Sequence, residues 1–413
     1  MNRRIFLRDS ALALVGIGTA PLWLTRAMAA SPAQGRRKIL VAIFQRGAAD
    51  GLNIVVPHGE AAYYRLRPTI AVPRPGSAEG SAIDLDGFFG LHPSLVSLKP
   101  VYDQGHLAIV DAVGSPDPTR SHFDAQDYME SGTPGSKAAG SGWMNRALGE
   151  RGSMQDASSL RGVALGPVLP KSLEGPNVAV AIQNLAAFQV RDPAASAEFE
   201  KLYSQSQDPL LSVAAKRTFG AVATVRALEK QPYVPEGGAQ YPGGRFGDGL
   251  RLIAQLIKAD VGLEMAFADI GGWDHHVNET GQRATEGQLA NLLRQYGDAL
   301  TAFWRDMGDR MEDIALVTMS EFGRTAQENG NRGTDHGHAN CMFVMGGSVA
   351  GGKVYGRWPG LEREQLNEAR DLALTTDFRD VLSELLALHM GASGLDAVFP
   401  SFRASFQGIV KKS

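Results

Sequence analysis

The sequence predicts an α/β fold with a mainly parallel central sheet and helices on both faces. Apolar runs of strand length alternate along the chain with longer segments whose apolar residues recur at helical spacing. The first run, Lys38–Phe44, is apolar at every position after its lysine, which is typical of a parallel strand buried on both faces. Alternating strands and helices favour a doubly covered sheet over a sandwich or a helical bundle.

The individual elements follow from the same two patterns. Strands are expected at Lys38–Phe44, Leu107–Val113, Gly162–Leu165, Val178–Ile182, Val261–Ile270, Ile314–Met319 and Cys341–Met345. Helices are expected at Phe123–Glu130, Leu210–Lys230, Asp248–Ala259, Glu286–Met311 and Asp377–His389. The proline- and glycine-rich stretch Pro232–Gly249 has no periodicity and predicts a long loop or a subdomain boundary inside one α/β domain, residues 30–413.

The N-terminus has the organisation of a Tat signal peptide, predicted for residues 1–29. Arg3 and Arg4 precede an apolar stretch, and Ala27-Met28-Ala29 offers small residues for cleavage. The apolar stretch is short for a bilayer span of about 20 residues, and Arg26 follows it closely, so we expect no stable membrane anchor. The Tat translocase is therefore an expected partner, and the mature protein is expected in the periplasm or outside the cell.

Composition excludes several classes of function. The 41 basic and 44 acidic residues nearly cancel, so nothing indicates binding to nucleic acid or to an anionic membrane surface. The single cysteine, Cys341, forbids an intrachain disulfide and lies in an apolar run that favours a small buried side chain. A redox protein is disfavoured, because the chain has no cysteine cluster for iron–sulfur ligation and no haem-attachment motif.

Two histidine clusters indicate a metal site. One is Trp273-Asp274-His275-His276, and the other is Thr334-Asp335-His336-Gly337-His338. Imidazole and carboxylate bind zinc, manganese or iron when they converge from separate parts of a fold. Each cluster follows an apolar, strand-like run, so both can reach one edge of the sheet. Either cluster alone also fits surface histidines beside turn glycines, but the pair favours metal binding.

Further carboxylates are expected at the same edge, because ligands collect beyond the carboxyl ends of parallel strands. Asp50 follows the first predicted strand, in a segment that also fits an ordinary turn. Glu321 follows the strand Ile314–Met319. The candidate ligands are too many for one tetrahedral zinc and suit two metals sharing a carboxylate: Asp50, Asp274, His276, Glu321, Asp335, His336 and His338.

A fourth polar patch, Arg120-Ser121-His122, follows the strand Leu107–Val113. Ser121 fits two roles, a nucleophile activated by a metal or an imidazole, or the N-cap of the helix that follows. His122 fits metal binding, substrate binding or a backbone hydrogen bond. Arg46, Arg120 and Arg324 lie near the predicted strand ends, where a guanidinium suits either an anionic ester or a protein carboxylate.

Several of these motifs resemble the DUF1501 family, over nearly the whole mature chain. They are Phe44–Asn53, Arg120–Gln126, Gly272-Trp273-Asp274, Ser320–Thr325 and Gly333–His338. The resemblance implies an alkaline-phosphatase-like fold, a two-metal site bound by Asp and His, and a Ser or Thr nucleophile. The chain departs from the family pattern at His275, where Thr is usual, and at Ala48, where Gly is usual. His276 is therefore the safer ligand, and His275 is an extra histidine.

These observations lead to one main hypothesis and one alternative. The main hypothesis is an exported, metal-dependent hydrolase of phosphate or sulfate esters that uses two divalent ions. Zinc is the first candidate ion, with manganese, calcium and iron as alternatives. Ser121, His122, Arg46 and Arg120 are the candidate catalytic residues, and the substrate is expected to be a small anionic ester. The alternative is an exported metal-binding protein without catalysis, with a role in assembly or surface binding.

Overall fold

The computed structural model describes residues 36–151, 158–183, 209–230 and 232–411. The chain divides into two compact units, Met1–Arg37 and Lys38–Ser413, and the architecture given below is that of the second unit. The predicted signal peptide, residues 1–29, lies outside the described residues. Within the described part of the chain, no helix combines the length and the apolar character needed to cross a membrane.

A nine-stranded sheet forms the centre of the second unit. Its strands are β1 (Ile39–Arg46), β5 (Leu107–Gly114), β6 (Gly162–Leu165), β7 (Ala179–Ile182), β8 (Met265–Gly271), β9 (Ile314–Met319), β10 (Asn340–Gly346), β11 (Lys353–Tyr355) and β12 (Thr376–Asp377). Their order is β11-β5-β10-β9-β1-β8-β6-β7, with β12 also paired to β5. Only β10 runs antiparallel to its neighbours in this sheet, which confirms the predicted mainly parallel arrangement.

Alternation along β1 divides the core into two layers. Ile39, Val41 and Ile43 belong to one apolar cluster, whereas Leu40 and Phe44 belong to another, because successive side chains of a strand point to opposite faces. The first cluster is covered by α5 (Lys99–Asp103), α9 (Pro209–Glu229), α10 (Arg245–Lys258) and α11 (Gln288–Met307). The second is covered by α6 (His122–Ser131), α7 (Trp143–Gly149), α12 (Phe378–Glu384) and α13 (Leu395–Val398).

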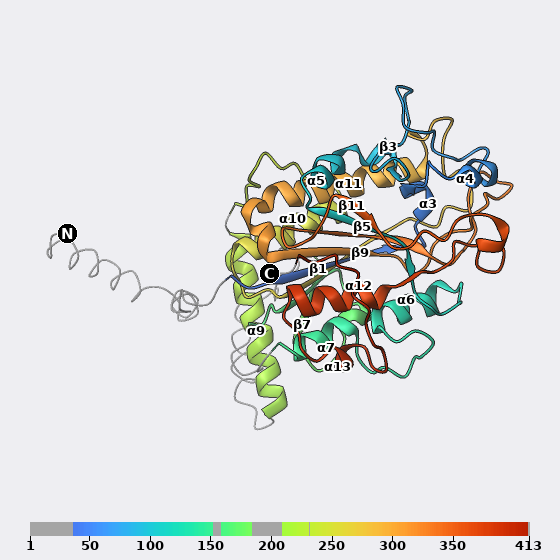
Figure 1. Ribbon diagram of the computed structural model, residues 1–413. Helices are drawn as coiled ribbons and strands as arrows, with labels where there is room; N and C mark the ends of the chain where they lie inside the picture. Colours follow the sequence, from blue (N-terminus) through green and yellow to red (C-terminus); the bar gives the residue numbers. More distant parts are fainter. Residues whose placement is uncertain (1–35, 152–157, 184–208, 231, 412–413) are drawn as a thin grey trace. The chain divides into compact units, whose positions relative to one another are not determined.

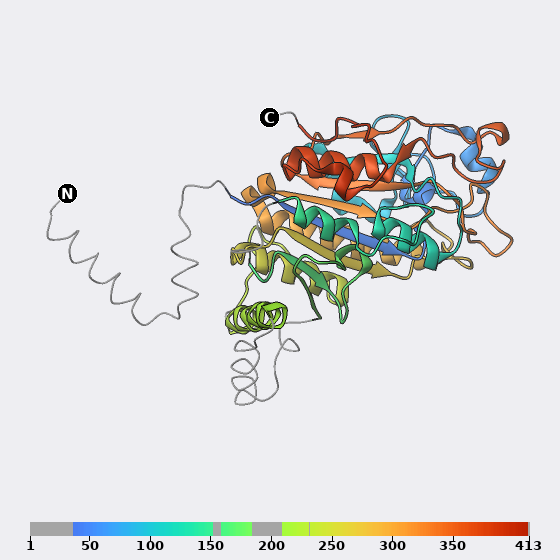
Figure 2. The ribbon, with the colours of Figure 1, turned by 90° about the horizontal axis from the view of Figure 1, so that it is seen from below.

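Figures 1 and 2 show the result, with α10 and α11 on one side of the sheet and α6, α7 and α12 on the other. The predicted fold class is therefore confirmed. The remaining elements are short. Among the described residues they are the antiparallel sheet β2 (Val55–Val56), β4 (Gly90–Leu91) and β3 (Ile83–Asp84) and the helices α3 (Gly51–Ile54) and α4 (Ala61–Leu66). The same part of the chain also contains 3₁₀ segments at Pro93–Leu98, Lys171–Leu173, Gly308–Asp313 and Arg363–Gln365 and the π-helical turn Leu385–His389.

Differences between the predicted and observed boundaries have local causes. The predicted strand Val261–Ile270 begins only at Met265, after a turn in which Asp260 and Gly262 have φ values of 52° and 82°. The predicted helix Glu286–Met311 ends at Met307, because Gly308 has φ 47° and leaves the α conformation. The loop predicted from Pro232 ends at Gly244, and α10 begins at Arg245 despite the glycines in its first turn.

The C-terminal π-helical turn is attached to the sheet by a buried histidine. His389 is 4% exposed, its Nε2 lies 3.1 Å from the carbonyl oxygen of Ile39, and its Nδ1 lies 2.8 Å from the hydroxyl of Ser348. Burial lowers the pKa of His389 to about 4, because the charged imidazolium loses its hydration. The fold therefore holds this side chain neutral.

This contact predicts acid destabilisation. The stabilisation is complete above the ordinary histidine pKa of about 6.5 and is lost as pH falls toward the folded value, by up to about 1.4 kcal/mol per pH unit. Replacing His389→Gln keeps a donor and an acceptor but removes the titration. Urea unfolding of the EDTA-treated protein at pH 7 and pH 5 should show a smaller loss of unfolding free energy in the variant. An equal loss in both proteins would contradict this assignment.

Candidate metal centre

The direction of the strands brings the polar clusters to one edge of the sheet. β9, β1 and β8 are neighbours and run parallel, so their carboxyl ends at Met319, Arg46 and Gly271 meet there. β10 runs the opposite way and begins at Asn340, so the residues that precede it arrive at the same edge. The second histidine cluster follows β9 after a loop, as expected, and lies directly before β10. The cluster reaches the edge because β10 is reversed.

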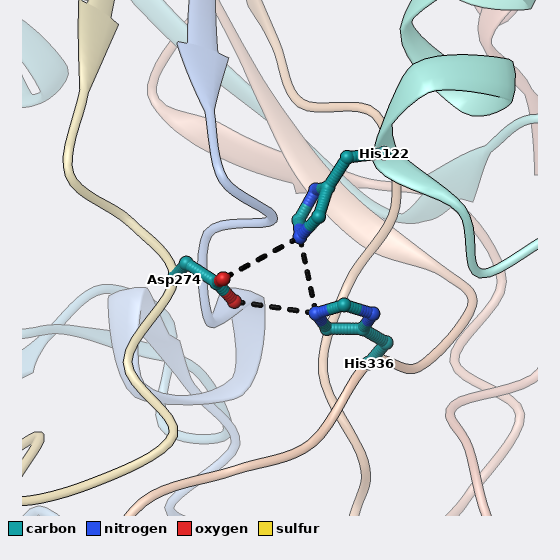
Figure 3. A group of neighbouring side chains, drawn as sticks. All are labelled: His122, Asp274 and His336. Carbon is teal, nitrogen blue, oxygen red and sulfur yellow. Dashed lines mark hydrogen bonds and ion pairs between the residues drawn. The ribbon is translucent and has the colours of Figure 1, made fainter.

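Three side chains from distant parts of the chain meet at this edge (Figure 3). His122 opens α6, Asp274 follows β8, and His336 lies in the loop before β10. The Nε2 atoms of His122 and His336 are 3.0 Å apart. Asp274 places Oδ1 3.2 Å from Nε2 of His336 and Oδ2 3.6 Å from Nε2 of His122. One ligand atom from each residue lies within 4.8 Å of the other two, which is close enough to share one ion.

His276 completes this group from the side of β8. Its Nε2 lies 3.0 Å from Nε2 of His336 and 3.0 Å from Oδ1 of Asp274. His122, Asp274 and His336 thus form the mutually close group and His276 contacts two of its members, and we name His122, Asp274, His276 and His336 the edge cluster. The sequence placed His122 among the candidate catalytic residues and left metal binding open as one of its roles. Only the fold reveals its contact with His336.

Each histidine of the edge cluster contacts a protein oxygen through Nδ1, the ring nitrogen that does not face the other histidines. His122 contacts Oε1 of Glu321 at 2.7 Å, His336 contacts the carbonyl oxygen of Arg120 at 2.9 Å, and His276 contacts Oδ1 of Asp335 at 3.0 Å. A carbonyl oxygen only accepts, so Nδ1 of His336 carries the proton and donates. Such outer contacts to a carboxylate or carbonyl orient metal-binding imidazoles in proteins. Two predicted ligands, Glu321 and Asp335, therefore contact the Nδ1 atoms of His122 and His276 and orient these rings.

Glu321 is buried and accepts several hydrogen bonds. Burial opposes its ionisation, but hydrogen bonds from His122, from the amide of Gln126 at 2.9 Å and from the backbone N–H of Gly47 at 2.9 Å hold its pKa below the usual value. Because the carboxylate is ionised, it accepts from Nδ1 of His122. Its hydrogen bond to His122 in turn raises the pKa of that imidazole against the effect of burial.

This arrangement fits a metal ion. With Nδ1 protonated, each neutral ring presents a lone pair at Nε2, and two lone pairs 3.0 Å apart repel unless a cation or a proton lies between them. Zinc binds nitrogen ligands at about 2.0–2.1 Å, so two nitrogens on one tetrahedral ion lie about 3.3 Å apart, close to the spacing here. A proton on His122 would satisfy the same lone pairs, so protons and metal compete for this site.

Arg324 holds the loops of the edge cluster together. Its guanidinium is buried and donates to the carbonyl oxygens of Ala48 at 2.6 Å, Trp273 at 2.9 Å and Thr334 at 3.1 Å, and to Oδ1 of Asp274 at 2.7 Å. Burial works against ionisation of Asp274, but the hydrogen bond and charge of Arg324 lower its pKa. The sequence left two roles open for Arg324, contact with an anionic ester or with a protein carboxylate. The structure shows the second, because Arg324 binds the carboxylate of Asp274.

The other predicted ligands lie apart from the edge cluster. Asp50 is buried in a bidentate ion pair with Arg67, whose Nη2 lies 2.9 Å from Oδ1 of Asp50. Among the described residues, no hydrogen bond or ion pair joins Asp50 to the three histidines. His338 accepts a hydrogen bond at its backbone carbonyl from Gly323, and burial lowers the pKa of its imidazole. The sequence predicted ligands for two metals. In the described part of the chain, however, the imidazole and carboxylate groups that lie close enough to share an ion form one group.

The remaining candidates also have protein partners. Ser121 is the N-cap of α6, and its Oγ accepts a long, 3.5 Å hydrogen bond from the backbone N–H of Asp124. Arg46 contacts Glu130 at 2.9 Å and Asp269 at 2.8 Å. Arg120 contacts Glu368 and Asp371 at 2.7 and 2.6 Å. These arginines therefore have carboxylate partners, which was the second possibility that the sequence left open.

Two positions where the sequence departs from the DUF1501 pattern have clear surroundings. Ala48 has φ 60°, in the left-handed region that glycine occupies without strain and that costs other residues about 1–2 kcal/mol. His275 is 4% exposed, and burial lowers its pKa to about 4, so it is a buried neutral side chain. Cys341 is also buried within β10, as its apolar surroundings predicted.

The fold and the edge cluster define an α/β protein with an imidazole–carboxylate site at the carboxyl edge of a parallel sheet. The chain belongs to the DUF1501 family, described as a family of proteins of unknown function, whose profile matches residues 101–399. The family resemblance is thereby confirmed over residues 101–399, and the motif Phe44–Asn53 lies outside the matched part. No curated protein matches the chain.

Several solved structures are similar in fold. The C-terminal periplasmic domain of EcEptC from Escherichia coli, in complex with Zn, has 9% identity and a TM-score of 0.34, with 76% of this chain and 74% of that chain covered. A protein of the alkaline phosphatase superfamily from Vibrio parahaemolyticus has 12% identity and a TM-score of 0.30, with 76% and 61% covered. The PsFucS1 sulfatase from Pseudoalteromonas sp. has 10% identity and a TM-score of 0.36, with 94% and 76% covered.

The edge cluster predicts a specific loss of metal. His336→Ala removes the Nε2 that contacts both other histidines, so the variant should retain less than a tenth of the metal measured by elemental analysis of purified protein. Its melting temperature should also fall, since an ion bound only by the folded state stabilises that state. His338→Ala is the matched control, two residues away, and should keep its metal. Equal metal content in the two variants would refute this site.

Proposed function

We propose that this protein is a metal-dependent hydrolase of phosphate or sulfate esters, with one divalent ion held by the edge cluster. The observation that carries the proposal is the mutual closeness of ligand atoms from His122, Asp274 and His336, with His276 in contact with the last two and each imidazole held at Nδ1 by an acceptor. A donor set dominated by imidazole favours zinc, or another transition metal, over calcium and magnesium. An ion bound there would supply positive charge to polarise an ester oxygen.

The exposure of the edge cluster favours catalysis over a purely structural role. The side chains of Asp274 and His276 are 47% and 39% exposed, and those of His122 and His336 are 25% and 24% exposed. A structural zinc site is closed by its protein ligands, whereas a catalytic site keeps a position open to substrate. The half-exposed carboxylate and imidazoles leave room for an anionic ester to approach from solvent.

Ser121 is the proposed nucleophile, because it directly precedes His122 at the start of α6. Its Oγ accepts the 3.5 Å cap bond from the backbone N–H of Asp124, and its hydroxyl hydrogen-bonds to the side-chain carboxylate of Asp124. As the nucleophile, the hydroxyl would leave this contact with Asp124 and turn toward the edge cluster. Attack by Oγ on the phosphorus or sulfur atom would release the alcohol and leave a covalent ester on Ser121, which water then hydrolyses.

Two substitutions separate the nucleophile from the helix cap. Ser121→Ala removes both roles, whereas Ser121→Asn removes the hydroxyl but keeps a good N-cap. If Ser121 is the nucleophile, both variants should lose at least a hundredfold in kcat on an aryl phosphate or aryl sulfate and keep their metal. If Ser121 only caps α6, Ser121→Asn should remain active, and Ser121→Ala should lose about 1 kcal/mol of stability. A metal-loaded parent that cleaves no ester would favour the non-catalytic metal-binding alternative.

We also propose export through the Tat translocase, on the basis of the residue pattern at positions 1–29. Replacing Arg3 and Arg4 together by lysine keeps the positive charge but removes the guanidinium pair that the receptor recognises. The double variant should accumulate as uncleaved precursor in the cytoplasm, which fractionation and immunoblotting would show. Normal export of the lysine variant would contradict the Tat assignment and leave the catalytic proposal unaffected.

A further inference from the structure

A hollow of about 490 Å³ adjoins the edge cluster on the side of Asp335. Three separate parts of the chain line it, namely α4, the loop after β9 and the segment that contains the 3₁₀ helix Arg363–Gln365. Asp335 belongs to both places, because it lines the hollow and its Oδ1 also holds Nδ1 of His276 at 3.0 Å. A molecule that occupies the hollow therefore lies one side chain away from the edge cluster.

Three arginines line this hollow, Arg65, Arg363 and Arg370. Arg363 is exposed and forms no ion pair with any described carboxylate. Arg65 pairs with Glu362 at 2.6 Å, but both side chains are more than half exposed, so this surface pair is weak and leaves other guanidinium donors free. Arg370 is 40% exposed and makes a loose contact with Asp371 at 3.3 Å.

The carboxylates of the hollow are already engaged by the protein. Glu328 accepts from the backbone N–H groups of Thr69 and Ile70, at 2.9 and 3.0 Å. Oδ1 of Asp335 contacts Nδ1 of His276 at 3.0 Å and accepts from the amide of Asn329 at 3.2 Å. Glu328 and Asp335 thus accept hydrogen bonds within the protein and Glu362 pairs with Arg65, whereas Arg363 has no described carboxylate partner. The hollow is therefore able to receive an anion.

Part of the wall is apolar. Leu66, Leu361 and Leu366 line the hollow together with the arginines. An apolar wall next to guanidinium groups suits a flat or ring-shaped group that carries a negative charge, since the ring covers the leucines and the charge faces the arginines. A volume of about 490 Å³ is within the range of small-molecule sites and exceeds what a bare phosphate or sulfate fills.

We propose that this hollow binds the non-reacting part of the ester and selects substrates in which a ring bears a second negative group. The inference rests on the proposed function, because it places the reacting phosphate or sulfate at the edge cluster. It adds a recognition site with Arg363 as the principal contact for the second anion. The second group, whether carboxylate, sulfate or phosphate, presents the same acceptor chemistry to a guanidinium.

Equilibrium binding tests this recognition without any need for turnover. The probes are (4-carboxybenzyl)phosphonate and benzylphosphonate, which resist hydrolysis and differ only in the carboxylate, and calorimetry on the metal-loaded protein gives both dissociation constants. The carboxylate should tighten binding about tenfold, as expected for one charge-assisted hydrogen bond. Arg363→Gln should reduce this ratio to about one without changing the affinity for benzylphosphonate.

Arg357→Gln is the matched control, since Arg357 is an exposed arginine six positions earlier that does not line the hollow. It should keep the tenfold preference. Equal binding of the two probes by the parent protein, an equal loss of preference in both variants, or the absence of binding by either probe would overturn the proposal. If the preference depends on Arg363 but the parent cleaves neither 4-carboxyphenyl nor phenyl phosphate or sulfate, the hollow stands and the hydrolase proposal fails.

Discussion

The buried guanidinium of Arg324 is the interaction on which the edge cluster depends. A buried charge is costly unless each donor has a partner, and Arg324 finds partners in the turn after β1, in the segment after β8 and in the loop before β10. The close approach also requires Gly337, because a Cβ there would lie 2.3 Å from the carbonyl carbon of Arg324. One side chain thus sets the spacing of the loops that carry Asp274, His276 and His336.

A second buried charge performs the same task for His122. Glu321 follows β9 and accepts hydrogen bonds from Gln126 of α6 and from Gly47 in the turn after β1, and it contacts the imidazole of His122. These contacts fix the ring so that Nε2 faces the other histidines. The edge cluster is therefore preorganised from behind, and its exposed side is left for a ligand. Such an arrangement combines rigid donors with an open face, which metal-dependent catalysis requires.

Charge is distributed unevenly around this edge. Arg46, Arg120 and Arg324 serve the protein, because each is bound to carboxylates or carbonyl oxygens that hold the loops. Arg363 is exposed and belongs to the hollow beside Asp335, and no described carboxylate pairs with it. The positions of the arginines thus separate those that build the edge cluster from one that is available to recognise an anionic ester.

The sequence by itself determined the mainly parallel sheet, because apolar runs and helical spacing are local, and it determined the residue types of the candidate site, because Asp and His clusters near strand ends are visible in the chain. Only the tertiary structure decided which of these residues meet. The reversal of β10, the contact of His122 with His336 and the pairing of Asp50 with Arg67 join distant positions. Strand direction and the partner of a buried charge are set by packing of the whole chain, and no local pattern records them.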